Sequence, residues 1–292
     1  MSIAKALDRA IMQQELTENP SLAAGYTVDG SYYDSYIENA AWEQFKSAMK
    51  KENPTAFEMY GEGGGKELED RESRGHIYPP KMASFGSSSR MIYNLMKSVP
   101  AFLFEKKLPT TVGGTANLDG FMETAEKCIF VEAKCREPYG KKSGEIGRKY
   151  EVLYRTLKTV TCHIDFINDD KMRVEFCVNG TSIEHFDMKQ MISHLLGVAT
   201  AYLNGTFTQP IDFVYLLYNP TSLKFESPTD KQEICDIYNL TCHECLATDF
   251  KALFYEILCF LQKEESFGVE TDTKSIADNF SFRLCDQYTM SV

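Results

Sequence analysis

The sequence lacks the features that mark membrane proteins and secreted proteins. No apolar run approaches the roughly 20 residues that a membrane-spanning helix needs, and residues 1–20 mix charged with apolar side chains instead of forming the apolar core of a signal peptide. We therefore expect a cytoplasmic protein with no membrane partner. The nine cysteines are an odd number in such a chain, which favours reduced thiols over a disulfide framework.

Motifs of several common enzyme classes are also missing. The stretch "GGGK" suggests a phosphate-binding loop, but Lys66 is followed by Glu67 instead of Ser or Thr, and Tyr60 occupies the position of the first glycine. No plausible Ser-His-Asp or Gly-x-Ser-x-Gly arrangement is present, which argues against the usual hydrolase triads. The sequence also contains no internal repeat and no long low-complexity segment.

The chain lacks the positive charge of a globally basic nucleic-acid-binding protein, since its net charge is −11. Between Lys127 and Lys158, however, nine Lys and Arg residues stand against four Glu and no Asp, which gives a local charge of +5. Phosphate contacts are made locally, so this segment is a candidate for contact with a nucleic-acid backbone. The alternative is an ordinary solvated loop.

A cluster of cysteines resembles a metal site in part. Cys242 and Cys245 are close in sequence, and Cys235 lies upstream of them. A closed zinc site needs four ligands, and Cys259 or Cys285 would have to supply the fourth at no recognised spacing. The sequence leaves open whether Cys235, Cys242 and Cys245 bind a metal.

The pattern of apolar residues predicts an α/β fold in which helices flank a mixed β-sheet. Residues 1–60 are expected to be mostly helical, and residues 60–86 to form a loop with at most one helical turn. The elements predicted after these are a helix at 87–100, strands at 101–111, 116–122 and 127–135, a helix near 148–158, a hairpin at 160–178, a helix at 187–205, a central strand at 211–220 and helix over 230–264. We interpret residues 1–292 as a single domain, with a core at about 85–225, an N-terminal helical region at 1–84 and a C-terminal helical region at 226–292.

The predicted strand at 127–135 carries charged residues near its end. Alternate residues of a strand share a face, and the face that must point into the core is formed by Ile129, Val131 and Ala133. The opposite face begins apolar and ends with Glu132 and Lys134. The turn before this strand lies within "METAEK", and its two plausible centres place Asp119 opposite either Phe130 or Glu132. Both registers put Asp119 on the face of Glu132 and Lys134.

Two carboxylates held this close and away from water repel each other unless a cation neutralises them. Lys134 supplies one positive charge. Mg²⁺ or Mn²⁺ would supply more, because such ions use one or two carboxylates and bridge to substrate phosphates. A metal in this position would acidify a bound water and polarise a phosphoryl oxygen. The simpler alternative is an ordinary ion pair at the end of a strand.

The motif "LDGF" followed after seven residues by "IFVEAK" resembles the core of the PD-(D/E)xK nuclease superfamily, the restriction-endonuclease-like fold. The resemblance covers roughly residues 85–220, and "PPKMASFGSSSR" upstream is similar to a bacterial branch of these proteins. It implies that Asp119 and Glu132 are metal ligands, that the Ala133 carbonyl is a third ligand, and that Lys134 is the catalytic lysine.

Other residues would complete such a site. Many members of the superfamily carry an acid in the first helix, which the stretch 87–100 lacks, and Glu67 is the first candidate to replace it, with Glu105 the second. Gln190 and His194 lie one turn apart on a predicted helix, where several relatives place residues near the phosphate; a plain polar flank is the alternative. A phosphate at the start of the helix at 87–100 would contact Ser88, Ser89 and Arg90, unless the serines only cap the helix.

The resemblance implies a nuclease dependent on Mg²⁺ or Mn²⁺ that hydrolyses phosphodiester bonds, with DNA the expected substrate. Many such enzymes pair two active sites to cut both strands, so a homodimer is a further expectation. The alternative is a non-catalytic member of the same fold that binds nucleic acid or a protein partner.

Overall fold

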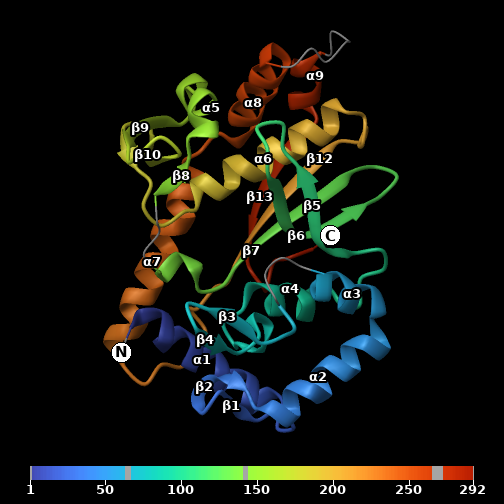
Figure 1. Cartoon of the computed structure of the whole chain (residues 1–292), viewed down its shortest axis with the longest axis vertical. Coiled ribbons are helices and arrows are strands. Elements are labelled where there is room, and N and C mark those ends of the chain that lie inside the picture. Colours follow the sequence, from blue (N-terminus) through green and yellow to red (C-terminus); the bar gives the residue numbers. More distant parts are fainter. Residues whose placement is uncertain (1, 63–66, 141–143, 265–271, 292) are drawn as a thin grey trace.

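A five-stranded mixed sheet crosses the middle of the molecule in the computed structural model, which describes residues 2–62, 67–140, 144–264 and 272–291 (Figure 1). In spatial order its strands are β13 (Phe280–Cys285), β12 (Ile211–Leu217), β7 (Cys128–Lys134), β6 (Thr115–Glu123) and β5 (Leu103–Pro109). The hairpins β5–β6 and β6–β7 are antiparallel, whereas β12 is parallel to both β7 and β13. The predicted α/β class, the three consecutive strands and the central strand are therefore confirmed.

Both faces of the sheet are covered, and this explains the continuous apolar runs of its central strands. Every residue of β7 and of β12 is buried. On one face, Phe130 and Phe213 join a core with α6 (Met188–Leu203). On the other face, Val131 and Val214 join a second core with α4 (Ser88–Met96). A central strand buried on both sides needs no polar alternation.

The N-terminal part of the chain contains more strand than the sequence suggested. Its elements are α1 (Ile3–Glu18), β1 (Ala24–Val28), β2 (Ser31–Ile37), α2 (Asn39–Glu52), α3 (Pro54–Glu62), β3 (Arg71–Ser73), β4 (His76–Tyr78) and a 3₁₀ helix at Lys81–Ala83. The expectation of a mostly helical region over 1–60 was wrong for the hairpin β1–β2. Its two-residue turn, Asp29-Gly30, has positive φ at both positions, as the tight turns that join two strands require.

A smaller sheet is inserted between β7 and α6. It consists of β8 (Glu145–Gly147), β9 (Thr161–Phe166), β10 (Lys171–Val178) and β11 (Thr181–Ser182), with α5 (Glu151–Thr156) between β8 and β9. The predicted hairpin is confirmed by the antiparallel pairing of β9 with β10, and the predicted helix forms over a shorter stretch. Strands β8 and β11 were not predicted, because each has only two or three residues.

The C-terminal part is helical except at its end. It contains α7 (Pro228–Leu246), α8 (Phe250–Glu264), α9 (Thr273–Asp278) and then β13. The predicted helix over 230–264 corresponds to α7 and α8, whereas the C-terminal region that was described as helical ends in the strand β13, an edge of the main sheet. Stacking of Phe280 on Phe254 and of Phe282 on Phe250 holds this edge strand against α8. None of the helices in the described ranges is long and apolar enough to cross a membrane.

Candidate active site

A cleft of about 380 Å³ lies where β7 ends, and it contains most of the predicted site residues. They are Asp119, Glu132, Ala133, Lys134, Glu67, Glu105, Ser88, Ser89 and Gln190. These residues come from β6, β7, β5, α6, the start of α4 and the segment that precedes β3. The main sheet therefore brings together side chains that are up to 123 positions apart in sequence, from Glu67 to Gln190.

The register of β6 and β7 places the two central acids opposite each other. Gly120 pairs with Val131, so continuing the antiparallel ladder by one residue sets Asp119 against Glu132. This is the second of the two predicted registers. Gly120 also allows Asp119 its position, because a Cβ at Gly120 would lie 2.3 Å from Cζ of Phe102. Gly120 therefore lets β6 pack closely against Phe102, while Asp119, the preceding residue, points towards the cleft.

Short contacts hold these side chains in place. The Ala133 amide donates to Oδ2 of Asp119 at 2.7 Å, and Nζ of Lys134 donates to Oε1 of Glu132 at 2.5 Å. His194 Nδ1 lies 3.1 Å from Oε2 of Glu132, so the imidazole faces the second oxygen of that carboxylate. His194 is buried and lines the neighbouring hollow and not the cleft, whereas Gln190 lines both.

Burial and neighbouring charges shift the pKa values of this group in opposite directions. Burial, followed by the charge of Glu132, raises the pKa of Asp119 well above its usual value. Burial also opposes ionisation of Glu132, but Lys134 and His194 outweigh it and lower the pKa of Glu132 to about 2. For Lys134, the surrounding acids outweigh burial and raise its pKa, so the ammonium is fully charged. The site therefore holds Glu132 as a carboxylate beside the fixed cation of Lys134, whereas the ionisation of Asp119 is disfavoured.

The two candidate replacements for the missing helix acid both lie in the cleft. Glu67 is buried and forms an ion pair with Lys81 at 3.2 Å. Glu105 falls between two ladder pairs of β5 and β6 and adopts a φ of 54°. Such a conformation is uncommon for a residue with a side chain, and strained positions of this kind cluster at functional sites. Burial, followed by the charge of Glu67, raises the pKa of Glu105 to about 7.

The donors present fit a hard divalent cation bound by few protein ligands. Within the described ranges, Oε2 of Glu67 is buried without a hydrogen-bond partner, and Oε2 of Glu132 meets only Nδ1 of His194, at 3.1 Å. Buried carboxylate oxygens left in this state favour a cation beside them. No three His, Cys, Asp or Glu side chains of the described residues form a complete metal-binding group. Mg²⁺ does not need one, because it keeps several waters and uses only one or two carboxylates.

Of the predicted phosphate-binding residues at the start of α4, the two serines line the cleft and the arginine lies elsewhere. Ser87 caps the helix by accepting a hydrogen bond from the Arg90 amide. Ser88 uses its hydroxyl to connect α4 to the end of β7, since it donates to Glu137 and accepts from the amide of Cys135. The Arg90 side chain does not reach the cleft. It is buried against Phe45 and Phe85 and pairs with Glu15 of α1.

Other residues of the cleft were not predicted. Asn117, Glu137, Arg136 and Lys81 line it as well. Arg136 lies within the basic segment from Lys127 to Lys158, which was the available signal for it. Lys81 lies in the stretch "PPKMASFGSSSR", which was singled out only for its resemblance to relatives and not for a lysine that would line the cleft.

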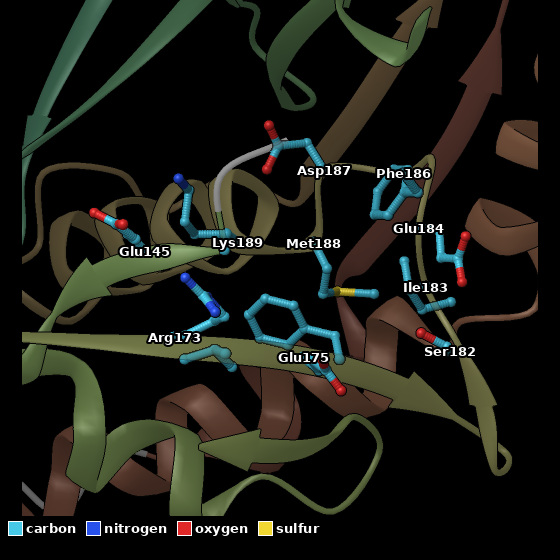
Figure 2. Close-up of a pocket in the computed structure, with 13 residues that line it drawn as sticks. Glu145, Arg173, Glu175, Ser182, Ile183, Glu184, Phe186, Asp187, Met188 and Lys189 are labelled. Atoms are coloured by element: carbon cyan, nitrogen blue, oxygen red, sulfur yellow. The ribbon is translucent and has the colours of Figure 1, made fainter. Parts of the chain in front are cut away.

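Two further hollows extend from this region. One of 410 Å³ shares Asn117 and Gln190 with the cleft, and one of 670 Å³ lies between β10 and the start of α6. Figure 2 shows Glu145, Arg173 and Lys189 at one end of the larger hollow. It carries charges of both signs and none of the central acids of the cleft, so the chemistry proposed below is assigned to the smaller cleft.

The cysteine cluster lies elsewhere, on α7. Cys235, Cys242 and Cys245 are all free thiols, and burial raises the pKa of each one. Raised pKa values disfavour the thiolate that binds zinc or iron.

Comparison with protein-family models, with curated proteins and with solved structures finds no match to this chain. A functional assignment must therefore follow from the geometry of the cleft.

Proposed function

We propose that the protein is a metal-dependent nuclease that hydrolyses phosphodiester bonds, with DNA as its substrate. The observation that carries this proposal is the position of Asp119 opposite Glu132 on adjacent strands, with Lys134 beside them in an open cleft. The order α4, β5, β6, β7, α6, β12 is the arrangement expected from the restriction-endonuclease-like resemblance. Both the fold assignment and the activity are proposals.

Asp119 and Glu132 would hold the cation, together with the carbonyl of Ala133. Glu132 is already ionised, whereas the raised pKa of Asp119 means that protons compete with the metal there. Bound Mg²⁺ or Mn²⁺ would supply an acidified water and polarisation of the phosphoryl oxygen. The Ala133 amide fixes one oxygen of Asp119, which leaves the other oxygen for the metal.

Lys134 is suited to bind the phosphate and to stabilise negative charge there. Its raised pKa makes it a poor acceptor of a proton from water. Glu105 is better suited to that task, because a pKa of about 7 lets its carboxylate take and release a proton near neutral pH.

Nicking of supercoiled plasmid DNA tests the proposal. We expect cleavage with Mg²⁺ or Mn²⁺, and a loss of at least about 100-fold on Asp119→Asn, since removing a metal-ligand charge abolishes most metal-assisted catalysis. Asp169→Asn is the matched control, because Asp169 is exposed in the turn between β9 and β10. Equal cleavage by the two variants would reject the assignment.

A non-catalytic binding protein of the same fold is the second candidate. The ion pair between Glu132 and Lys134, supported by His194, already neutralises the central acid without a metal. Retained binding of an oligonucleotide with no cleavage under Mg²⁺, Mn²⁺ or Ca²⁺ would support this candidate.

A further inference from the structure

Arg136 presents a guanidinium to the cleft from just beyond β7. It lies two residues after Lys134, and its side chain is 38% exposed. Nη1 donates to Oδ2 of Asp8 at 3.1 Å. Asp8 belongs to α1, 128 positions earlier in the chain, and its own side chain is only 4% exposed. A buried acid from a distant helix thus holds a partly exposed cation at the wall of the cleft.

The backbone at Gly86 leaves the space that the ion pair between Asp8 and Arg136 occupies. Gly86 also lines the cleft, and a Cβ at this position would lie 1.9 Å from Oδ1 of Asp8 and 3.5 Å from Cδ of Arg136. Any other residue at position 86 would displace the carboxylate. Within the described ranges, Oδ1 of Asp8 has no hydrogen-bond partner, so Asp8 commits a single oxygen to Arg136.

The other cations of the cleft are arranged differently. Lys134 and Lys81 are each held by an acid of the cleft itself, Glu132 and Glu67 respectively. Arg71, the other guanidinium that lines the cleft, donates through Nε to the carbonyl of Pro79 at 3.3 Å. A lysine ammonium is a compact point charge, whereas a guanidinium offers five N–H donors in a planar fork. Arg136 can keep Asp8 on one nitrogen and present the remaining donors to two oxygens of a phosphate.

We propose that Arg136 binds a backbone phosphate of the nucleic-acid strand in the cleft, and that Asp8 is the positioning residue that directs it. This inference rests on the proposed function. It gives α1 a part in the site, and it transfers to Arg136 the phosphate contact that the sequence suggested for Arg90.

Binding of labelled oligonucleotides tests the role of Arg136. Fluorescence anisotropy of the full-length protein with a 20-nucleotide strand and the matching duplex, in Ca²⁺ and between 50 and 200 mM salt, gives both affinity and its salt dependence. Removing one phosphate contact should reduce the slope of log K against log salt by about 0.9 for duplex. We therefore expect Arg136→Gln to bind about tenfold more weakly with this smaller slope. Arg136→Lys should keep the slope but bind several-fold more weakly.

The matched control is Arg9→Gln. Arg9 lies on the same α1, its side chain is 37% exposed, and it pairs with Asp34 at 2.7 Å outside the cleft. We expect its binding to equal that of the unchanged protein. Equal binding by Arg136→Gln and Arg9→Gln would overturn this inference alone, whereas an unchanged protein that binds neither oligonucleotide would overturn the proposed function as well.

Asp8→Asn separates positioning from charge. This variant keeps the charge of Arg136 but weakens the contact that orients its guanidinium. We therefore expect weaker binding of the oligonucleotide with an unchanged salt slope. Tighter binding would show that Asp8 only neutralises Arg136 and would reject the positioning role.

If a variant fails to fold, modification of the unchanged protein by phenylglyoxal decides the question. Bound oligonucleotide should protect Arg136 and leave Arg9 reactive; modification of Arg136 at the same rate with and without oligonucleotide would reject the contact.

Discussion

Asp119 and Glu132 face each other across two neighbouring strands, yet their pKa values move in opposite directions. Lys134 and His194 both lie against Glu132, so the negative charge of the pair is concentrated on that residue. Asp119 has the Ala133 amide as its polar contact, and its ionisation would place a second charge beside Glu132. In the protein without metal, ionisation of Asp119 is therefore disfavoured, and Glu105 is protonated at pH values below about 7.

This protonation predicts a pH-dependent affinity for metal. The raised pKa values of Asp119 and Glu105 mean that protons compete with the cation, so Mn²⁺ affinity should fall as the pH drops below about 7. The expected change is about tenfold per pH unit for each proton released. Titration calorimetry at pH 5.5, 6.5 and 8 measures it, and Glu105→Gln should reduce the proton release. An affinity that does not change over this range would contradict the arrangement.

At the scale of elements, the sequence predicted the helices and strands whose apolar residues recur at regular spacing and are buried in a core. The short apolar run at 128–131 predicted β7, which packs against a core on each face, and the helical spacing of apolar residues predicted α6. The missed hairpin β1–β2 had a signal of another kind. Its Asp-Gly pair sets positive φ at both turn positions, and this turn chemistry outweighed the helical spacing of the apolar residues nearby.

From the sequence, only those site residues could be placed together whose positions are set by the hairpin of β6 and β7. Asp119, Glu132 and Lys134 could be placed together because strand alternation and one short turn fix their relation. Arg136 and Asp8 could not, since their contact depends on how α1 packs against the loop after β7. The same holds for the position of Arg90, which the sequence placed at a helix start but the fold turns towards α1.

The packing of α6 on β5 and β6 gives a prediction for a single element. A Cβ at Gly197 would lie 2.6 Å from Cβ of Ala116 and 3.2 Å from Cβ of Leu108. Replacing Gly by Ala in a helix normally stabilises it by about 1 kcal/mol. Overpacking costs about 1 to 3 kcal/mol, so we expect Gly197→Ala to lower the unfolding free energy despite its better helix propensity. Thermal unfolding measures the sign.

Gly205 provides the contrast for that experiment. It follows the end of α6 with a φ of 70° and no atom within 4 Å of a Cβ placed there. Gly205→Ala should therefore destabilise through backbone strain alone, without a packing clash. A stabilising Gly197→Ala would mean that α6 can move away from the sheet and that the position of His194 is not fixed by this contact.

At the scale of the whole molecule, α1 joins parts of the chain that are distant in sequence. Asp8 reaches Arg136 after β7, and Glu15 reaches Arg90 in α4. Leu7, on the same helix, joins the core that also contains Val131 of the main sheet. The N-terminal segment is thus part of the structure that shapes the cleft and not a peripheral addition to it.

The ion pair between Glu15 and Arg90 gives the last prediction. Burial raises the pKa of Glu15 and lowers that of Arg90, so each charge is desolvated and the pair offsets that cost only while it is intact. Breaking a buried pair costs about 3 to 5 kcal/mol, and the partial exposure of Glu15 favours the lower end for Glu15→Gln. Replacing both residues, as in Glu15→Gln with Arg90→Met, should restore much of the lost stability, because no buried charge is then left unpaired. Urea denaturation of the single and double variants measures this coupling. A double variant no more stable than Glu15→Gln alone would show that Arg90 stabilises the fold mainly through its contacts with Phe45 and Phe85, and not through its charge.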